Sequence, residues 1–257
     1  MVVGVMQARM GATRFPGKTL AEIEGKRLLE HIIDRVRASR HLQRIVVATT
    51  TLPEDEPVTI CARQCGVDVF RGSVSDVLDR FYQAACQVGA TIIVRLTADD
   101  PFKDPEVIDK TIEEYLRRVP EIDYVSNTLQ PTYPEGLDVE VFSFVALEAS
   151  WREAKLPLDR EHVTPYIYHH PERFRIAQVQ YREDLSGLRW TLDYPEDLAF
   201  AREVYRRLYG GQIFKMEEIL TLLRAHPEIA TINAGHIRNE GYLKALAAEA
   251  AAEKKYS

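Results

Sequence analysis

Cysteine is scarce in this sequence, and its few copies are not spaced as pairs. Cys61, Cys65 and Cys86 are the three cysteines among 257 residues, with no Cys-x-x-Cys spacing and no histidine nearby in zinc-ligand spacing. Neither a disulfide framework nor a zinc site is therefore expected. Free thiols in a reducing cytoplasm fit this pattern, and Cys61 and Cys65, one helical turn apart, are expected to pack in the core.

Long apolar runs and an excess of positive charge are also absent. No stretch approaches about 20 apolar residues, and the apolar start at 1–6 is too short for a signal-peptide core, so we expect neither membrane insertion nor secretion. With 33 Lys and Arg against 39 Asp and Glu, the net charge of -6 argues against polynucleotide binding through a broad basic surface. Small anionic ligands remain compatible with this charge.

The first half of the chain alternates between two hydrophobic periodicities. Apolar, β-branched runs predict buried strands at 2–6, 44–49, 67–70 and 91–96. Between them, apolar residues at helical spacing predict helices at 28–36 and 77–85. Such alternation is typical of parallel strands joined by right-handed helical crossovers, so the sequence predicts a Rossmann-like α/β fold with a mostly parallel sheet.

After Pro120 the alternation becomes irregular. Further strands are predicted at 123–126, 137–142, 174–181 and 188–192, and further helices at 195–208 and 216–225. No repeat or linker divides the chain, so we expect a single domain over 1–257 with an embedded smaller lobe at about 131–171. A tail at about 239–257, rich in Ala, Glu and Lys, is expected to be helical.

The loop after the first predicted strand is rich in cations. It carries Arg9, Arg14 and Lys18. Five residues separate its two glycines and one of them is Pro16, so the loop is not a P-loop, and the dinucleotide Gly-x-Gly-x-x-Gly fingerprint is missing too. Open α/β sheets bind ligands at the carboxyl ends of their strands, where guanidinium and ammonium groups suit phosphate. We interpret the loop as an anion-binding loop; a solvated basic loop is the alternative.

Carboxylates follow two other predicted strands. Asp99 and Asp100 come directly after the strand at 91–96, and Asp193 follows the strand at 188–192 and precedes Pro195. Two carboxylates together with phosphate oxygens are a usual environment for Mg²⁺, so acids beside a phosphate loop indicate metal-assisted nucleotide chemistry. Asp193 on its own is equally well explained as the cap of the following helix.

The chain resembles the sugar-acid cytidylyltransferases (CMP-sugar synthetases) in its opening loop, 7–18, which reads QARMGATRFPGK. Within them it is most similar to the F-type branch of spore-coat polysaccharide biosynthesis proteins. The resemblance covers roughly residues 1–210 through five further blocks: 46–50 (VVATT), 69–73 (VFRGS), 76–81 (DVLDRF), 123–128 (DYVSNT) and 136–142 (GLDVEVF).

This resemblance implies a fold and an activity. The fold would be a GT-A-like, three-layer α/β fold. The activity would be transfer of CMP from CTP to a sugar or sugar acid with release of pyrophosphate, for surface polysaccharide biosynthesis, with Mg²⁺ as cofactor. A homodimer is implied in which the embedded lobe meets its partner. The many apolar side chains of 131–171 agree with an interface there, and packing of the lobe back on its own sheet is the alternative.

The resemblance also implies residue roles. Asp99 and Asp193 would hold the metal, and Arg14 and Lys18 would steady the leaving pyrophosphate, which makes these four the catalytic candidates. Ala98 stands where the family usually has glycine before the metal acid. The nucleotide-binding candidates lie in the first loop, in the segment that follows the third predicted strand, and before Asp99: Ala8, Arg9, Met10, Gly11, Arg14, Lys18, Arg71, Asp76, Thr97 and Ala98.

Two segments are candidates for binding the acceptor sugar. Asp138 and Glu140 would share one face of a strand and accept hydrogen bonds from hydroxyls, and Arg160 would grip a substrate carboxylate. The remaining candidates are Tyr133, Glu161 and His162. An imidazole beside Glu161 suits an acid or base, and a hydrogen-bonded structural histidine at a helix start is an equal alternative.

Two other classes of function are compatible with these patterns. A GT-A glycosyltransferase would combine a nucleotide pocket with acids, but an Asp-x-Asp metal motif is expected there, whereas Asp99 and Asp100 are adjacent. A non-catalytic nucleotide-binding subunit of a polysaccharide assembly complex is the second class. The presence of all four catalytic candidates argues against it.

Overall fold

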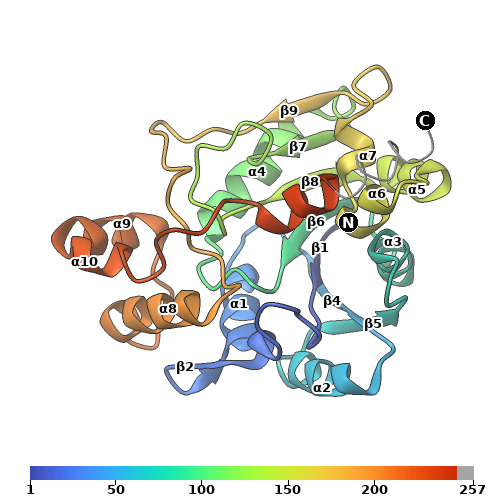
Figure 1. Cartoon of the computed structure of the whole chain (residues 1–257). Helices are drawn as coiled ribbons and strands as arrows, with labels where there is room; N and C mark the ends of the chain where they lie inside the picture. Colours follow the sequence, from blue (N-terminus) through green and yellow to red (C-terminus); the bar gives the residue numbers. More distant parts are fainter. Residues whose placement is uncertain (248–257) are drawn as a thin grey trace.

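A seven-stranded sheet forms the centre of the computed structural model, which describes residues 1–247 (Figure 1). The strands lie in the order β5-β4-β1-β6-β8-β7-β9. Only β8 runs antiparallel to its neighbours, β6 and β7. Their bounds are β1 Val2–Gln7, β4 Arg44–Thr50, β5 Asp68–Gly72, β6 Ile92–Thr97, β7 Tyr124–Ser126, β8 Glu140–Ser143 and β9 Ile176–Gln178. The prediction of an α/β fold with a mostly parallel sheet is confirmed.

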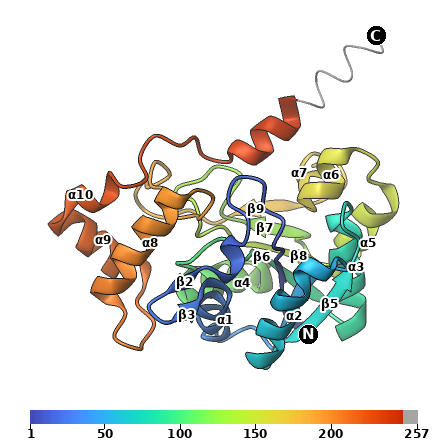
Figure 2. The same cartoon turned by 60° about the horizontal axis from the view of Figure 1, so that its bottom comes forward.

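Helices cover both faces of this sheet and give three layers (Figure 2). On one face pack α1 Leu28–Arg37, α2 Glu56–Gln64, α4 Pro105–Arg118, α8 Pro195–Leu208, α9 Met216–Ala225 and the short α10 Pro227–Ala230. On the other lie α3 Val77–Val88, α5 Phe144–Glu153, α6 Pro157–His162 and α7 Pro165–Tyr168. Each face has its own apolar core, because the strands are buried on both sides and carry apolar residues at consecutive positions.

Local patterns fixed most of these elements. The four strands predicted before residue 100 are β4, β5, β6 and the fully buried β1, and the helices predicted at 195–208 and 216–225 coincide with α8 and α9. Pro195 begins α8 because the first helical turn needs no amide donor there. A 3-10 turn, Lys18–Leu20, and a two-stranded hairpin, β2 Glu22–Ile23 with β3 Lys26–Arg27, connect β1 to α1; a second 3-10 turn, Pro53–Asp55, precedes α2.

The predicted strand at 188–192 is wrong. These residues form one isolated bridge, between Arg189 and Glu135, and otherwise run as irregular chain. Two backbone hydrogen bonds with Glu135 make this bridge, and the backbone of Trp190 and Thr191 then packs against Gly136, where a Cβ atom would come within 2.8 Å of the Thr191 nitrogen. The apolar side chains that suggested a strand, such as Trp190 and Leu192, are buried there against the core without a ladder.

The segment predicted as an embedded lobe, 131–171, contributes β8 to the main sheet and α5, α6 and α7 to one face of it. Most of its apolar side chains, including Leu137, Phe142 and Ile167, are buried within the chain. Its large exposed apolar side chains are Val145, 74% exposed, and Leu156, 47% exposed. The packing of this segment on its own sheet therefore accounts for most of the apolar content that suggested an interface.

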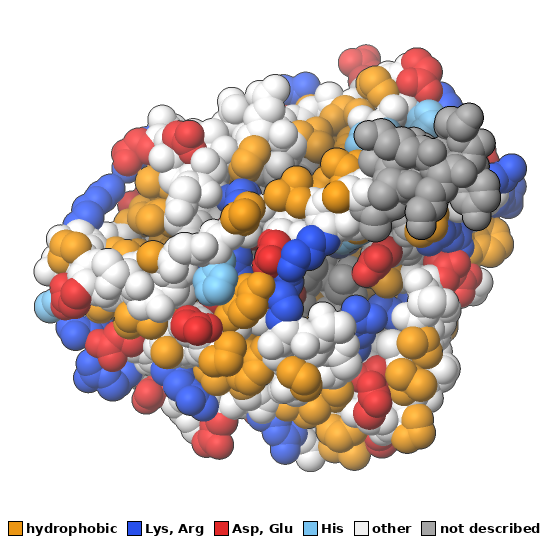
Figure 3. Space-filling view, viewed as in Figure 1, with side chains coloured by type: hydrophobic (Ala, Val, Ile, Leu, Met, Phe, Trp, Pro, Cys, Tyr) orange, Lys and Arg blue, Asp and Glu red, His pale blue; other side chains and the backbone are white. Residues whose placement is uncertain are grey.

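The C-terminal part of the described chain is helical over 240–247, and the rest of the predicted tail, 248–257, lies outside the described residues. No described helix is both long and apolar enough to cross a bilayer. On the face shown in Figure 3, Lys and Arg side chains are interspersed with Asp and Glu side chains. Cys61 is buried in the core as predicted, whereas Cys65 is half-buried and Cys86 is exposed.

Candidate active site

The first loop is held in a compact turn at the carboxyl end of β1. The Met10 amide donates to Asp55 Oδ1 at 2.6 Å, and the Gly17 amide donates to the Met10 carbonyl at 3.0 Å. Gly17 has a φ of +77°, a left-handed conformation that glycine adopts without steric cost. The Thr19 hydroxyl closes the turn by donating to the Arg9 carbonyl at 2.9 Å. The loop thus turns back on itself and delivers Lys18 into the molecule.

The Lys18 ammonium lies where three oxygen atoms converge. Its Nζ is 2.9 Å from Asp99 Oδ2, 2.7 Å from Asp193 Oδ1 and 2.7 Å from the Leu192 carbonyl. The Lys18 side chain is 9% exposed, whereas Asp99 and Asp193 keep 33% and 18% of their side-chain surface. Burial alone would lower the pKa of Lys18, but the charges of Asp99 and Asp193 outweigh it and raise this pKa. Burial alone would raise the pKa of Asp99, but the charge and hydrogen bond of Lys18 outweigh this effect and hold the pKa at about 2.

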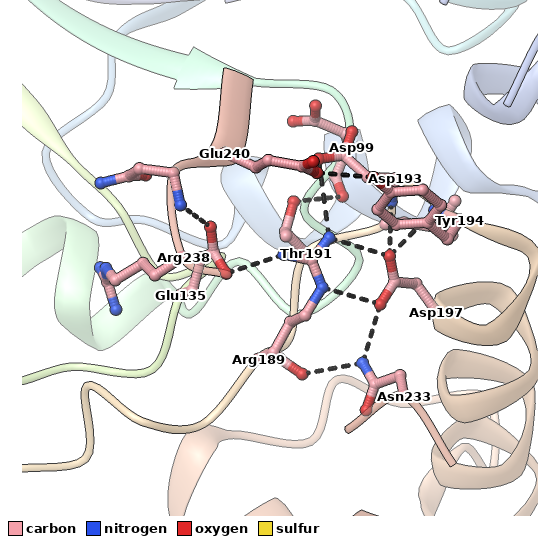
Figure 4. A network of polar contacts seen from close by, with 12 residues as sticks. Asp99, Glu135, Arg189, Thr191, Asp193, Tyr194, Asp197, Asn233, Arg238 and Glu240 are labelled. Carbon is pink, nitrogen blue, oxygen red and sulfur yellow. Dashed lines mark hydrogen bonds and ion pairs between the residues drawn. The ribbon is translucent and has the colours of Figure 1, made fainter. Parts of the chain in front are cut away.

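Asp193 faces this ammonium and does not cap α8. The cap is made by Asp197, whose Oδ2 accepts the backbone amides of Asp193 at 2.8 Å and Tyr194 at 2.9 Å (Figure 4). Arg189 donates to both carboxylate oxygens of Asp197 at 3.0 Å, and the Asn233 amide donates to Oδ1 at 2.9 Å. Because Asp197 satisfies the start of the helix, the Asp193 carboxylate is left for the cavity. Of the two interpretations that the sequence left open for Asp193, capping is excluded.

Two neighbouring cavities meet at these acids. The first has a volume of about 240 Å³ and the second about 560 Å³. Asp99, Asp193, Thr97, Gln7 and His162 line both. The predicted nucleotide-binding residues in the first cavity are Ala8, Arg9, Arg14, Lys18, Thr97 and Ala98, and the predicted acceptor residues Glu161 and His162 also line it. Asp138, Glu140 and His162 are the predicted acceptor residues in the second cavity.

Several predicted site residues are engaged elsewhere. Neither Arg160 nor Asp76 is among the described residues that line the two cavities. Arg160 donates to Asp76 at 2.5 and 3.0 Å and to the Trp151 carbonyl at 2.7 Å, while Asp76 also caps α3 by accepting from the Asp79 amide at 2.9 Å. The sequence could not show that these two predicted ligands of different substrates, 84 residues apart, neutralise each other.

Four more predicted residues are absent from the described cavity linings. Arg71 donates to the carbonyl oxygens of Thr50 and Leu52, at and just after the end of β4, and pairs with Glu56. Tyr133 is 1% exposed, and its hydroxyl accepts from Lys110 at 3.1 Å. Met10 and Gly11 shape the first loop, but neither is among the described cavity-lining residues. The structure therefore does not place these four predicted residues in the walls of the two cavities.

Asp138 and Glu140 enter the second cavity in different ways. Glu140 begins β8, is 5% exposed, pairs with Arg95, and accepts from the Tyr124 and Thr164 hydroxyls, each at 2.6 Å. Burial opposes the ion pair with Arg95, but the pair prevails and lowers the pKa of Glu140. Asp138 precedes the strand, so the predicted shared strand face is wrong, and burial raises its pKa.

Two buried arginines at the site were missed by the sequence reasoning. Arg80, 1% exposed, lies on the core-facing side of α3 and lines the first cavity, where burial and the charge of Arg9 lower its pKa to about 10. Arg95, in the middle of β6, lines the second cavity beside Glu140. The Nε atoms of both are buried and have no hydrogen-bond partner among the described residues. The sequence signal for both was a charged residue among buried positions: Arg80 on the apolar face of α3, and Arg95 within the apolar run of β6.

His162 lies between the two cavities. Its Nε2 is buried without a hydrogen-bond partner among the described residues, and burial lowers the pKa of the ring. The imidazole is therefore neutral near pH 7. Its position at the end of α6, in both cavity walls, is compatible with contact to either ligand.

The donor set around Lys18 also fits a divalent cation. Two carboxylate oxygens and one carbonyl oxygen already surround a positive charge within 2.9 Å. Mg²⁺ takes hard oxygen ligands and usually completes its shell with water and substrate phosphate. Asp99 and Asp193 are the residues that would hold it.

A cationic loop after β1, Asp99 after the parallel strand β6, and Asp193 facing both from the irregular chain before α8 are typical of an α/β nucleotide-binding protein. The chain belongs to the cytidylyltransferase family, which it matches over residues 3–222. It is 37% identical to an uncharacterized protein of Methanocaldococcus jannaschii, covering 94% of this chain and 97% of that one. It is 33% identical to the spore coat polysaccharide biosynthesis protein SpsF of Bacillus subtilis, covering 90% and 97%. A cytidylyltransferase structure from Leptospira borgpetersenii is 31% identical over 92% of this chain and 98% of that one, with a TM-score of 0.87.

Proposed function

We propose that this cytidylyltransferase transfers CMP from CTP to a sugar or sugar acid for surface polysaccharide biosynthesis. The observation that carries the proposal is the position of Asp99, Lys18 and Asp193 at the junction of the two cavities. A nucleotide in the first cavity and an acceptor in the second would meet at this junction. The similarity to a Bacillus protein of spore coat polysaccharide biosynthesis supports a role in a polysaccharide pathway.

In the proposed reaction, an acceptor hydroxyl oxygen attacks the α-phosphorus of CTP and releases its proton to water. The bond from that phosphorus to the bridging oxygen breaks, and pyrophosphate leaves. Arg9, Arg14 and Lys18 line the first cavity and would hold the triphosphate oxygens in place, so that negative charge is stabilised where it develops. Mg²⁺, held by Asp99 and Asp193, would supply additional positive charge at the phosphates.

The second cavity favours an acceptor that is rich in hydrogen-bond donors. Its lining includes the carboxylates of Glu135, Asp138 and Glu140, which accept but do not donate when ionised. Hydroxyl groups of a sugar would satisfy them. Arg95 is the arginine among the described lining residues of this cavity, so we propose that the carboxylate of a sugar acid would face Arg95, a role that the sequence suggested for Arg160.

The test is pyrophosphate release from CTP and Mg²⁺ with a panel of sugars and sugar acids. Asp99→Asn should keep the fold but lower turnover at least about 100-fold, which corresponds to roughly 2.7 kcal/mol of barrier. Asp68→Asn is the matched control, because it also removes a carboxylate from an ion pair with a cation, Arg44, and neither residue is among the described residues that line the two cavities. Near-normal turnover of the Asp99 variant would reject its role. Consumption of a nucleotide sugar without pyrophosphate release would instead favour a glycosyltransferase, and CTP binding without turnover a non-catalytic subunit.

Nucleotide choice is a separate part of the proposal. The family membership supports CTP as the nucleotide that this chain uses. Calorimetry in the presence of Mg²⁺ should give tighter binding of CTP than of ATP or GTP, and the reverse order would reject the assignment. Removal of Mg²⁺ with a chelator should abolish turnover.

We also propose a cytoplasmic homodimer. Val145, at the start of α5, and Leu156, after its end, are large exposed apolar side chains in the segment that the resemblance assigns to the interface. Light scattering on dilute protein should give about twice the chain mass. Val145→Asp should shift that mass toward the monomer, and a monomeric wild-type protein with full activity would reject the dimer.

A further inference from the structure

The last described segment of the chain, 236–247, crosses the site. It leaves α10 and returns over the carboxyl ends of the central strands toward α6 and α7, as both views show (Figures 1 and 2). We call this segment the C-terminal strap. It lies beyond residue 222, where the match to the cytidylyltransferase family ends. Its contacts with the site are therefore additional to what the family match describes.

Specific contacts fix the strap at its start. Arg238 donates to Asp138 Oδ1 at 3.0 Å and to the Tyr133 carbonyl at 3.1 Å. The Asn239 amide donates to Glu135 Oε1 at 2.7 Å. Asp138 and Glu135 are themselves part of the second cavity, so the strap is attached to the cavity wall. Its path is determined by the site and not by the helices that precede it.

The strap then forms part of the second cavity. Asn239, Glu240, Gly241 and Tyr242 all line it. The Tyr242 ring lies 5.2 Å from the His162 ring in an edge arrangement. Without these four residues the second cavity would have no wall on this side, so the strap limits the size and shape of any acceptor.

Glu240 links the strap to the first cavity. Its Oε2 accepts from Arg14 Nη1 at 3.3 Å and from the Tyr194 hydroxyl at 2.5 Å, and its Oε1 pairs with Lys244 Nζ at 2.5 Å within the strap. The Arg14 guanidinium also donates to Asp193 at 2.5 Å, so both of its terminal nitrogens are occupied by carboxylates. Arg14 lines the first cavity and is proposed above to hold the triphosphate. A triphosphate can bind both terminal nitrogens of Arg14 only if the carboxylates of Glu240 and Asp193 leave them.

We infer that Glu240 is an acceptor-binding residue that CTP sets free. In the structure its carboxylate pairs with Arg14; when a triphosphate takes Arg14, the Oε2 of Glu240 becomes available to accept a hydrogen bond from a hydroxyl or amino group of the acceptor in the second cavity. CTP binding therefore precedes and strengthens acceptor binding. The inference rests on the proposed function, because it assumes that CTP occupies the first cavity.

The physical basis is competition between two anions for one guanidinium. Arg14 and Glu240 keep 26% and 24% of their side-chain surface, so water and ligand reach the pair and its exchange requires no unfolding. A triphosphate carries more charge than one carboxylate and binds guanidinium bidentately, so it displaces Glu240. The exchange is a coupling between the two cavities, and linkage requires that the acceptor also tighten CTP binding.

The first experiment is calorimetry of Mg²⁺ and CTP with Glu240→Gln. Glutamine keeps the size of the side chain and its hydrogen bond to Tyr194 but removes the competing charge. We expect CTP to bind about 3- to 10-fold more tightly to this variant, and no such gain when Arg14 is already replaced in Arg14→Met. Glu203→Gln is the matched control, because Glu203 is also 24% exposed and pairs with two cations, Arg206 and Arg207, away from both cavities.

The second experiment measures KM for both substrates with the acceptor that the pyrophosphate assay identifies. Glu240→Gln should lower KM for CTP and raise KM for the acceptor at least about 3-fold, whereas damage to the fold would weaken both. Unchanged CTP affinity in the variant, or an acceptor KM equal to that of the wild type, would overturn the inference. Failure of the wild-type protein itself to bind CTP would reject the proposed function instead.

Discussion

Lys18→Met tests the junction of the two cavities most directly. Methionine keeps the unbranched length of the side chain but leaves the carboxylates of Asp99 and Asp193 without their shared ammonium. Removing one partner of a fully buried pair costs about 3–5 kcal/mol. Because Asp99 keeps 33% of its surface and water can solvate it, we expect about 2–3 kcal/mol of lost stability. For a chain of this size that loss lowers Tm by about 4–12 °C.

Lys26→Met is the matched control for this prediction. Lys26 Nζ lies 2.9 Å from Asp34, the same distance as Lys18 from Asp99, but the two side chains are 42% and 39% exposed. An exposed pair contributes about 0–1 kcal/mol, so this variant should lose less than about 4 °C. Equal losses in the two variants, measured by differential scanning calorimetry, would refute the argument from burial.

Mg²⁺ and pH give two further readouts on the same variant. Mg²⁺ should raise Tm more in Lys18→Met than in the wild type, because the ammonium no longer competes for Asp99 and Asp193. Lys18 holds the pKa of Asp99 at about 2 against the effect of burial, below its unfolded value. This stabilisation is present above about pH 4 and is lost as pH falls toward about 2, so the Tm difference between the variant and the wild type should shrink as pH falls from about 4 toward about 2. A Mg²⁺ effect equal in both proteins would contradict the shared site.

Three other predictions concern the support of the site. Asp197→Ala should lose about 1–3 kcal/mol in urea unfolding, because the backbone amides of Asp193 and Tyr194 lose their acceptor and the buried guanidinium of Arg189 keeps Glu135 as its hydrogen-bonded carboxylate; a loss below about 1 kcal/mol would contradict this. Gly136→Ala, at a φ of +104° and against the Thr191 backbone, should cost about 1–3 kcal/mol or more, and unchanged stability would show that the loop relaxes freely. Burial, together with neighbouring carboxylates and despite a nearby ammonium, raises the pKa of Asp100 to about 6. Because the folded state holds this proton more tightly, wild-type stability relative to Asp100→Asn should rise as pH falls from about 6 to about 4, and an identical pH profile would reject the shift.

The sequence was sufficient for the elements whose cause is local. Consecutive β-branched apolar residues predicted β1, because a strand buried on both faces needs no polar alternation. Pro195 followed by apolar residues at helical spacing predicted α8 with its bounds. The cations of the first loop and Asp99 could be assigned to one edge of the sheet, because parallel strands place their carboxyl ends on the same side.

Only the tertiary structure decided which of the candidate side chains face the two cavities. Asp193 could be a cap or a ligand until Asp197 was seen to satisfy the helix start. Arg160 was a candidate for a substrate carboxylate, but it pairs with Asp76 from a distant part of the chain. The periodicity of a segment records its burial and not the partner against which it is buried, so pairings over such sequence separations leave no local trace.

The position of the C-terminal strap also could not be predicted from the sequence. The composition of the tail from about 239 onward predicted a helix, and the described chain is helical over 240–247. A helix-forming tail can nevertheless lie anywhere on the surface. Its position is set by Arg238 on Asp138, by Asn239 on Glu135 and by Glu240 on Arg14. The sequence determined the chemistry available to the site, because residue types and local propensities are encoded along the chain. The fold determined which of those groups meet, because contacts between distant segments form only when the whole core packs.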